Sequence, residues 1–390
     1  MRRLSLLLCV LVACSGEPTR PITTEPESTT TGPTASPTTA PTVTTPPFLV
    51  GGLDTWASAV ANVYGPACSG DRSKLPLELA SLAPSPDCPT GGIAVTAQVP
   101  GAILASASFG EDVIFGVDYG SGFEIVALRV PSLGNTDGWY GAVPKVVALV
   151  GADARPGEEP AVTRADSLHL FGLSGAGAGG LIGIPRDSWV PIGGGAANKI
   201  NASLSGGGPD LMMSTLNSVS GLSLGGYVLT GFEGFQELWG NILGGAEVEV
   251  PIRIADAAAG ADLQPGLQYL NGPQALSFGR ARKSLAAGDL TRQLHGGLAI
   301  LAALRKAQGL GPLGLPTLLA ASEPWIRTNI RWGDLLSLSA LALATPTEQI
   351  GNVVVPARTG TVGTASVVFL NDGAGAVFAD LADGAIAPGT

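Results

Sequence analysis

The stretch LFGLSGAGAGGLIGIPRDSW, residues 170–189, decides between two architectures for this chain. Its glycines Gly175, Gly177 and Gly180 match the G-x-G-x-x-G spacing that lets a backbone approach the pyrophosphate of a dinucleotide. In that role the motif follows a strand, opens a helix and precedes an acidic residue by about 20 positions. A glycine-rich turn between two strands fits the same letters and implies a different fold.

The residues around the glycines favour the turn. SLHLFGL (167–173) reads as a strand before it, and LIGIP (181–185) reads as a second strand rather than as a helix. Asn198 and Lys199 stand where the ribose-binding acid belongs. We therefore predict a strand-to-strand turn, and we expect the chemistry to begin just after it, at IPRDSW (184–189).

From about residue 143 onward, strands alternate with helices. VPKVVALVGAD (143–153) has the apolar run of a strand, whereas PDLMMSTLNSV (209–219) and FEGFQELWGNIL (232–243) carry helical spacing. Strands that alternate with helices indicate a layered α/β domain. We place this domain at residues 141–385.

Residues 48–140 have a shorter, β-like pattern. GIAVTAQV (92–99), DVIFGVD (112–118) and FEIVALRV (123–130) are short apolar or alternating runs between glycine and proline turns. We predict a small β-rich accessory module in front of the α/β domain.

The N-terminus has the features of an export signal. MRRLSLLLCVLVACSGEP combines two arginines, an apolar run and small residues, which is typical of a secretory signal peptide (1–13) and too short for a spanning helix. The tetrapeptide LVAC also resembles a bacterial lipobox, in which Cys14 is acylated; ordinary cleavage and a retained anchor are the alternatives. We expect an exported protein that is held by lipid at the outer face of the bacterial cytoplasmic membrane.

The next segment lacks any core-forming pattern. Residues 17–47 contain 20 threonines or prolines in 31 positions, so we assign 14–47 to the lipidated cysteine and a stiff, extended tether. With Cys9 removed and Cys14 lipidated, Cys68 and Cys88 remain. Two cysteines in an exported chain most simply form one disulfide.

Charge and composition exclude several functions. A net charge of -10 and a pI near 4.7 disfavour nonspecific binding to nucleic acid, which needs a basic surface. With only two histidines, His169 and His295, we expect neither a Ser-His-Asp triad nor a histidine-rich zinc site. Sixteen of the 21 basic residues are arginine, which suits two-pronged contact with phosphate or carboxylate.

Arginines and aspartates stand close together in sequence at four places, and a surface salt bridge is the ordinary explanation of one such pair. A cluster of arginines beside carboxylates also suits a magnesium-bound phosphate, because guanidinium groups clamp oxygens while the cation neutralises charge. We expect Arg280 and Arg282 on one face of an extended segment, and Asp289 and Arg292 on one face of a helix. The four places are GADARP with Asp153 and Arg155, TRADS with Arg164 and Asp166, IPRDSW with Arg186 and Asp187, and GRARKSLAAGDLTRQ with Arg280, Arg282, Asp289 and Arg292.

Longer stretches surround these places: IPRDSWVPI, NKINASLSGGGPDLMMSTL, GFEGFQELWGNILGGAEVEVP, and LNGPQALSFGRARKS followed by GDLTRQ. In order and spacing they closely resemble the LytR-CpsA-Psr family of cell-wall glycopolymer transferases. The likeness runs from about residue 143 to 380 and includes the tail NVVVPARTGTVGTASVVFL, whereas residues 48–140 lie outside it.

The resemblance implies roles for individual residues. Asp153 and Asp166 match the carboxylates that hold magnesium, and Asp289 matches a carboxylate in the pyrophosphate site. Lys199 falls at another motif position, which we assign to cofactor binding. The arginines that match those binding the pyrophosphate of a polyprenyl-linked donor are Arg164, Arg186, Arg280, Arg282 and Arg292.

The resemblance also implies a fold and an activity. The fold would be a three-layer α/β/α domain with a central mixed sheet and an apolar tunnel for the polyprenyl chain. Leu298, Leu301 and Leu304 could line that tunnel, although ordinary core fits the same spacing. The activity would be magnesium-dependent transfer of a glycopolymer to a peptidoglycan hydroxyl, the 6-hydroxyl of N-acetylmuramic acid, with Asp289 as the first candidate for accepting the proton.

One departure from the family pattern concerns the helix after GDLTR. The family often has Arg-Gln where this chain has His295 and Gly296, so we expect a weakened donor contact. We expect His295→Arg with Gly296→Gln to strengthen donor binding without loss of stability. The departure favours one alternative, a non-catalytic protein that binds polyprenyl phosphate at the cell wall. A second alternative, a pyrophosphatase with water as the acceptor, would use the same residues as the transferase.

Overall fold

A computed structural model describes residues 48–283, 285 and 288–387 of the chain. The expected signal peptide, the lipidated Cys14 and the tether (14–47) lie outside these residues. Among the described residues, no helix combines the length and the apolar character that crossing a membrane requires.

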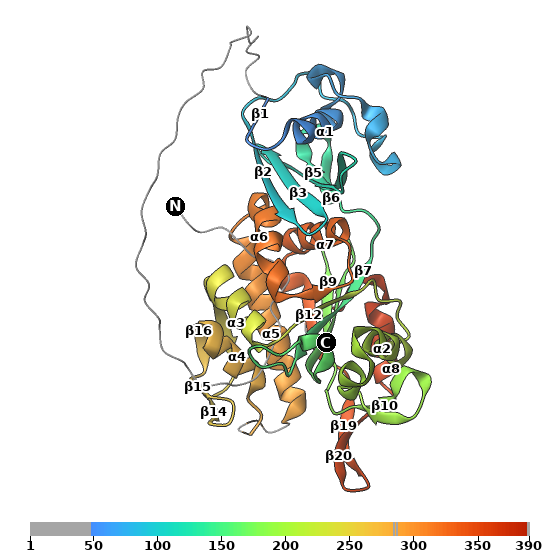
Figure 1. The fold of residues 1–390 in the computed structure, drawn as a ribbon, viewed down its shortest axis with the longest axis vertical. Helices are drawn as coiled ribbons and strands as arrows, with labels where there is room; N and C mark the ends of the chain where they lie inside the picture. Colours follow the sequence, from blue (N-terminus) through green and yellow to red (C-terminus); the bar gives the residue numbers. More distant parts are fainter. Residues whose placement is uncertain (1–47, 284, 286–287, 388–390) are drawn as a thin grey trace, which may run out of the picture.

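A six-stranded mixed sheet forms the centre of the α/β part of the chain (Figure 1). Its middle strands are antiparallel neighbours, while each flank holds a parallel pair, β7 with β12 and β9 with β18. The strands, in spatial order, are β17 (Arg327–Thr328), β12 (Tyr227–Thr230), β7 (Lys145–Ala152), β8 (Ala165–Leu173), β9 (Gly179–Gly183) and β18 (Ile350–Val354).

The stretch at 170–189 forms the predicted turn. β8 and β9 are an antiparallel hairpin, and the Ser174 amide donates to the Ala178 carbonyl at 3.0 Å to close it. Gly175 and Gly177 have φ angles of 80° and 77°, which residues with a Cβ rarely adopt. The prediction of a turn rather than a dinucleotide-binding loop is therefore confirmed.

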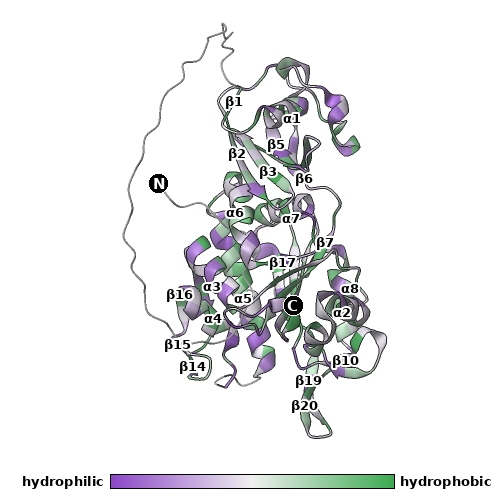
Figure 2. Ribbon diagram, viewed as in Figure 1, coloured by the Kyte–Doolittle hydropathy of each residue, from purple (hydrophilic) through white to green (hydrophobic). Residues whose placement is uncertain are grey.

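Helices cover both faces of the central sheet, as the alternation along β7 requires. Val147 and Leu149 belong to a core shared with α3 to α7, whereas Val146 and Ala148 belong to a second core shared with α2 and α8. Hydrophobic and hydrophilic residues alternate along α3 and α5, as expected of helices with one buried face (Figure 2). The helices are α2 (Ala202–Ser220), α3 (Phe232–Gln236), a π-helical turn (Glu237–Ile242), α4 (Gly272–Arg280), α5 (Asp289–Gln308), α6 (Leu315–Ser322), α7 (Trp332–Ala344) and α8 (Ala374–Asp380).

The N-terminal part is a second six-stranded sheet that lies at one end of the molecule (Figure 1). Helix α1 (Asp54–Tyr64) covers one of its faces, and a disulfide between Cys68 and Cys88 joins the loops that follow. Three of its strands fall where the sequence predicts them. Its strands are β1 (Leu49–Val50), β2 (Gly92–Val99), β3 (Ala102–Phe109), β4 (Asp112–Asp118), β5 (Phe123–Val130) and β6 (Asn135–Trp139).

The other face of this N-terminal sheet packs against α6 and α7. Leu104 and Val117 share one hydrophobic core with Leu335 of α7. The Trp332 indole donates to the Pro100 carbonyl at 3.2 Å, and the Ser106 hydroxyl donates to a carbonyl beside α6 at 2.6 Å. The two sheets are thus joined through a common core, and the domain limits at 48–140 and 141–385 stay a prediction.

Four two-stranded ribbons complete the fold. The β19–β20 ribbon projects from the end of the molecule opposite the N-terminal sheet (Figure 1). The ribbons pair β10 (Trp189–Pro191) with β11 (Ala197–Lys199), β13 (Ala246–Val250) with β16 (Gly266–Leu270), β14 (Ile254–Asp256) with β15 (Ala261–Leu263), and β19 (Ala357–Val362) with β20 (Ala365–Leu370).

Candidate active site

A buried carboxylate joins two of the arginines that the sequence singles out. Asp166 of β8 is 1% exposed, and its Oδ1 contacts Nη1 of Arg186, in the loop after β9. The same oxygen lies 3.4 Å from Nη1 of Arg292, in the first turn of α5. One carboxylate thus contacts two guanidinium groups.

The first turn of α5 adds a second carboxylate. Oδ1 of Asp289 lies 2.6 Å from Nη2 of Arg292, so the two residues share one helix face as predicted. Gly288, with a φ of 51°, turns the chain into the helix just before Asp289. An acidic residue at this end of a helix also interacts favourably with the helix dipole.

Several buried polar atoms of this cluster have no hydrogen-bond partner among the described residues. They are Nε of Arg186, Nε and Nη2 of Arg292, and both carboxylate oxygens of Asp289. Nη2 of Arg292 and Oδ1 of Asp289 are close enough for an ion pair but lack hydrogen-bond geometry. A buried polar group without a partner costs about 1–3 kcal/mol, so oxygens of a bound anion would stabilise these arginines.

The pKa of Arg186 depends on the charged groups of the same cluster. Burial lowers the pKa of the Arg186 guanidinium, and the guanidinium groups of Arg292 and Arg282 lower it further, while Asp289 and Asp187 act in the opposite direction. Arg282 therefore belongs to the field of this cluster although it follows a different helix. An anion bound among these residues would reduce the repulsion between the guanidinium groups.

The expectation for Arg280 and Arg282 is wrong in its local structure. Arg280 is the last residue of helix α4, which begins with a capping box between Asn271 and Gln274, so the two arginines do not share the face of a strand. The Arg280 guanidinium lies 6.0 Å from the ring centroid of Phe232. Arg282 follows the helix and is exposed.

Asp256, which the sequence did not single out, holds the segment after α4. Its Oδ2 accepts hydrogen bonds from the backbone amides of Arg282 at 2.8 Å and Lys283 at 2.9 Å. Burial alone would raise the pKa of Asp256, but these two amides together with those of Ala259 and Ala258 keep it below its usual value. The sequence signal is weak, because a lone aspartate in IADAAAG resembles an ordinary turn residue.

The other residues predicted for the site, Asp153, Arg164 and Lys199, lie at the margin of the cluster. The Asp153 amide donates to the Arg164 carbonyl at 2.8 Å, which brings these segments together, and both side chains are exposed. Neither side chain forms an ion pair with another described residue. Nζ of Lys199 lies 2.9 Å from Oδ1 of Asp187, the residue after Arg186. Lys199 thus borders the cluster through Asp187.

The sequence over this fold and cluster matches a known family. Residues 139–378 match the model described as the LytR_cpsA_psr family, which is more than half of the chain. The chain belongs to the LytR-CpsA-Psr family. The resemblance of the motif stretches to this family is therefore confirmed.

Two curated relatives have names from cell-wall assembly. The probable cell wall biosynthesis protein LcpB of Corynebacterium glutamicum is 32% identical over 156 residues, which make up 37% of this chain and 37% of that protein. The polyisoprenyl-teichoic acid–peptidoglycan teichoic acid transferase TagU of Bacillus cereus is 30% identical over 198 residues, or 50% of this chain and 63% of that protein. The chain thus spans between 37% and 63% of the length of these relatives.

A solved structure supports the fold. TagT bound to LI-WTA superimposes on this chain with a TM-score of 0.52 and 20% identity, over 63% of this chain and 92% of that one. The predicted α/β class with a central mixed sheet is confirmed by this likeness and by the two helical layers. The apolar tunnel stays a prediction, and Leu301 and Leu304 are buried in the core.

The departure from the LytR-CpsA-Psr pattern at His295 has a packing explanation. His295 is 1% exposed and stacks on Phe278 of α4, with ring centroids 4.7 Å apart. Burial lowers its pKa to about 4, so the ring is neutral at pH 7. Arginine at position 295 would place a charge in this buried stack. We therefore expect His295→Arg to destabilise the protein, in contrast to the unchanged stability expected from the sequence.

His169 lies beneath the cluster on β8. Its Nε2 lies 2.9 Å from the carbonyl of Gln293, the residue after Arg292, and its Nδ1 lies 3.2 Å from the Ser167 hydroxyl. Burial lowers the pKa of His169, the hydrogen bond with the Gln293 carbonyl raises it, and the positive charge of Arg292 lowers it. The resulting pKa is about 4. A neutral His169 fastens α5 to the sheet and adds no charge to the cluster.

The carboxylates of the cluster fit magnesium by type. Magnesium prefers oxygen ligands, and in proteins it often takes one or two carboxylates together with substrate phosphates and water. Asp289 has two buried oxygens without a hydrogen-bond partner, and Asp153 and Asp166 lie on segments that meet at the same place. Within the described part of the chain, no three acidic, histidine or cysteine residues gather into a metal site, so a phosphate ligand would have to complete one.

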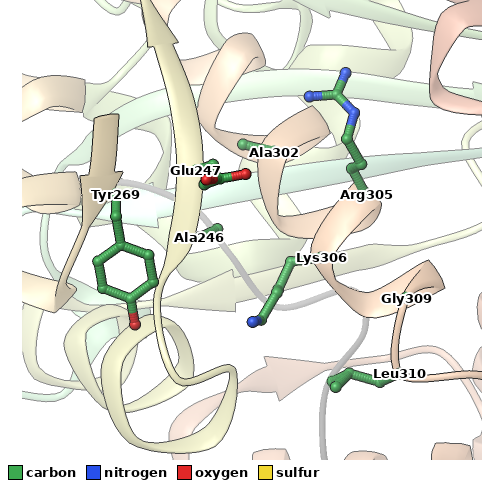
Figure 3. A pocket seen from close by; sticks show the side chains of 8 residues that line it. All are labelled: Ala246, Glu247, Tyr269, Ala302, Arg305, Lys306, Gly309 and Leu310. Atoms are coloured by element: carbon green, nitrogen blue, oxygen red, sulfur yellow. The ribbon is translucent and has the colours of Figure 1, made fainter. Parts of the chain in front are cut away.

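A charged pocket lies at the other end of α5 (Figure 3). It has a volume of about 410 Å³, and it is lined by Arg305 and Lys306 of α5 and by Glu247 and Tyr269 of the β13–β16 ribbon. Since Arg305 is 13 residues beyond Arg292 along the helix, this pocket lies about 20 Å from the cluster. The two sites are therefore separate.

Proposed function

We propose that this protein transfers a glycopolymer from a polyprenyl-pyrophosphate donor to a hydroxyl of peptidoglycan. The observation that carries the proposal is the partly buried Arg186 and the buried Arg292, whose guanidinium groups keep donors without a hydrogen-bond partner beside the Asp289 carboxylate. Membership of the LytR-CpsA-Psr family and the name of the TagU relative support this substrate class.

The cluster suits a phosphoryl transfer in which the protein binds and neutralises charge. Arg186, Arg282 and Arg292 would hold the pyrophosphate oxygens. The acceptor oxygen would attack the phosphorus bonded to the first sugar, and the bond from that phosphorus to the bridging oxygen would break. Asp289 would take the hydroxyl proton, because its oxygens have no hydrogen-bond partner among the described residues. The products are a phosphodiester and polyprenyl phosphate.

Magnesium belongs to the same proposal. Asp153 and Asp166 would hold it, beside the oxygens of Asp289. When bound, it would neutralise charge on the pyrophosphate oxygens. Dependence of transfer on added magnesium, restored after chelation, tests this part of the proposal.

The place of action is also proposed. Lipid on Cys14 would hold the chain at the outer face of the bacterial cytoplasmic membrane, and the tether (14–47) would let the folded part reach peptidoglycan. The test is the variant Cys14→Ser, which should leave the membrane fraction while remaining folded. A variant that stays with membranes after a high-salt wash contradicts lipid anchoring through this cysteine.

The activity itself is tested by incubating the mature chain with a polyprenyl-pyrophosphate-linked glycopolymer and soluble peptidoglycan fragments. We expect release of polyprenyl phosphate together with a phosphodiester-linked product, detected by mass spectrometry. Release of polyprenyl phosphate with a free glycopolymer phosphate, whether or not an acceptor is present, would identify a pyrophosphatase instead.

A further inference from the structure

Another pocket, of about 300 Å³, opens at the carboxyl edge of the central sheet. β7 and β12 are parallel neighbours, so the loops that follow them, 154–160 and 231–234, leave the same edge of the sheet. Residues 324–327 close the pocket from a third side. In layered α/β folds, ligands bind outside the carboxyl ends of strands, and this pocket occupies that position.

The pocket adjoins the candidate active site at two points. Ala154 lines it and follows Asp153 directly in the chain. Phe232 lines it as well, and the guanidinium of Arg280 lies 6.0 Å from the ring of Phe232. A molecule in the pocket would therefore lie beside the residues proposed to bind the donor.

The walls of the pocket are held by their own contacts. Oε2 of Glu158 accepts from the Arg155 amide at 2.8 Å, and Oε2 of Glu159 pairs with Arg327 at 3.0 Å. The Thr230 hydroxyl donates to the Trp325 carbonyl at 2.8 Å and fixes the segment that carries the indole. The shape of the pocket is thus set by the fold before a ligand binds.

Other groups in the pocket remain available to a ligand. Within the described part of the chain, the Glu233 carboxylate and the Arg155 guanidinium form no hydrogen bond or ion pair, and both side chains are exposed. The indole of Trp325 is half-buried at the wall. A carboxylate accepts from hydroxyl groups, a guanidinium donates to hydroxyl or carbonyl oxygens, and an indole covers the apolar face of a ring.

This combination differs from the arginine cluster in charge. Three glutamates and two arginines line the pocket, so it does not attract a pyrophosphate as the cluster does. We propose that the pocket binds the acceptor saccharide, with Glu233 and Trp325 as its recognition residues. The proposal rests on the proposed transferase function, because it assigns to this pocket the hydroxyl-bearing substrate of that reaction. Binding here would hold the hydroxyl next to the donor phosphorus.

The test compares matched variants of two pockets in the mature full-length chain. Glu233→Gln and Trp325→Leu alter the proposed acceptor pocket, while Glu247→Gln and Tyr269→Leu make the corresponding changes in the pocket at the far end of α5. The probe is a soluble peptidoglycan disaccharide-peptide without donor, and its equilibrium binding is followed by ligand-observed nuclear magnetic resonance. We expect about tenfold weaker binding for the first two variants and unchanged binding for the controls.

Transfer kinetics give a second readout. The acceptor KM should rise about tenfold in Glu233→Gln while the donor KM stays the same. Equal disaccharide binding by Glu233→Gln and the unaltered chain, or no binding by the unaltered chain, overturns the pocket assignment. A raised donor KM in Glu233→Gln also overturns the pocket assignment. Should Trp325→Leu fail to fold, Glu233→Gln still decides, because its exposed side chain has no partner among the described residues. Disaccharide binding that depends on Glu233, in a chain that transfers nothing, would reject the transferase function alone.

Discussion

The two ends of α5 carry the same kinds of side chain in different surroundings. At the N-terminal end, Arg292 is 2% exposed, contacts Asp289 and Asp166, and still has donors without a partner. At the C-terminal end, Arg305 is 57% exposed and lies 3.9 Å from Glu348, which is 70% exposed. Charge alone does not distinguish these ends, whereas burial with incomplete pairing does.

This difference shows which arginine pairs indicate function. An exposed ion pair exchanges contacts with water for contacts with protein, and the net free energy is close to zero. A buried guanidinium with an unpaired donor is costly, so the fold keeps it only where a ligand or another group compensates. This criterion favours the proposed binding site at Asp289 and Arg292, and it classes the pair of Arg305 with Glu348 as ordinary surface.

The largest expected effect is at the buried end. Arg292→Lys should lower the rate of glycopolymer transfer about 100- to 1000-fold, because lysine keeps the charge and loses the forked contact with phosphate oxygens. The matched control is Arg305→Lys on the same helix, which should transfer normally. Rates are measured with saturating donor, and circular dichroism checks that both variants are folded. Near-normal transfer by folded Arg292→Lys would break the distinction between the two ends.

A smaller effect is expected where the cluster is held indirectly. Asp256→Asn replaces a carboxylate that accepts four backbone amides, including that of Arg282, so the Arg282 segment should lose its position. We expect about a tenfold fall in transfer, with a larger change in donor KM than in acceptor KM. The control is Asp262→Asn on β15, whose exposed carboxylate pairs with Arg253. An equal change in both KM values would indicate general damage to the fold rather than a positioning role for Asp256.

The sequence predicts elements best where the signal is local. The hairpin at 170–189 and the helix face shared by Asp289 and Arg292 depend on neighbours in the chain, and both predictions are confirmed. Strand β3, AILASASF, was not predicted, because its alanines and serines resemble a turn-rich segment until β2 and β4 cover both of its edges.

The site was predictable in its residues but not in its arrangement. Arg280 was expected in a strand because its spacing to Arg282 was considered alone, while the capping box that starts α4 is formed by Asn271 and Gln274, earlier in the chain. Asp256 acts through backbone amides 26 residues away, and no motif records such a contact. Which face of α5 carries His295 depends on α4 packing beside it, so its stack on Phe278 appears only in three dimensions.

The buried end of α5 should also be the end that responds to pH. The folded pKa values of His169 and His295 are about 4, below the ordinary value of 6.5. As the pH falls from about 6.5 toward 4, the unfolded chain gains protons that the folded chain does not, so the free energy of unfolding decreases. We expect a melting temperature several degrees lower at pH 5 than at pH 7.5.

His295→Phe is the matched variant for this pH dependence. Phenylalanine keeps the ring stacked on Phe278 and removes one of the two titrating groups, so the fall in melting temperature between pH 7.5 and pH 5 should shrink. An unchanged fall in His295→Phe would mean that this residue is not buried in its neutral form. His169 would then have to account for the whole dependence.

The smallest effect is expected at the exposed end, and it completes the comparison. Arg305→Gln removes a guanidinium whose Nε lies 3.9 Å from Oε1 of Glu348, at the outer limit of an ion pair and in contact with solvent on both sides. Water solvates the Arg305 and Glu348 side chains equally well whether they are apart or in contact. Salt screens the weak attraction between their charges. We expect the melting temperature to change by no more than about 2 °C in low salt, by less in 0.5 M salt, and transfer to be unaffected. A fall of many degrees would mean that burial does not separate the two ends of α5. A loss of transfer as large as that of Arg292→Lys would mean, in addition, that the pocket of Figure 3 takes part in the reaction.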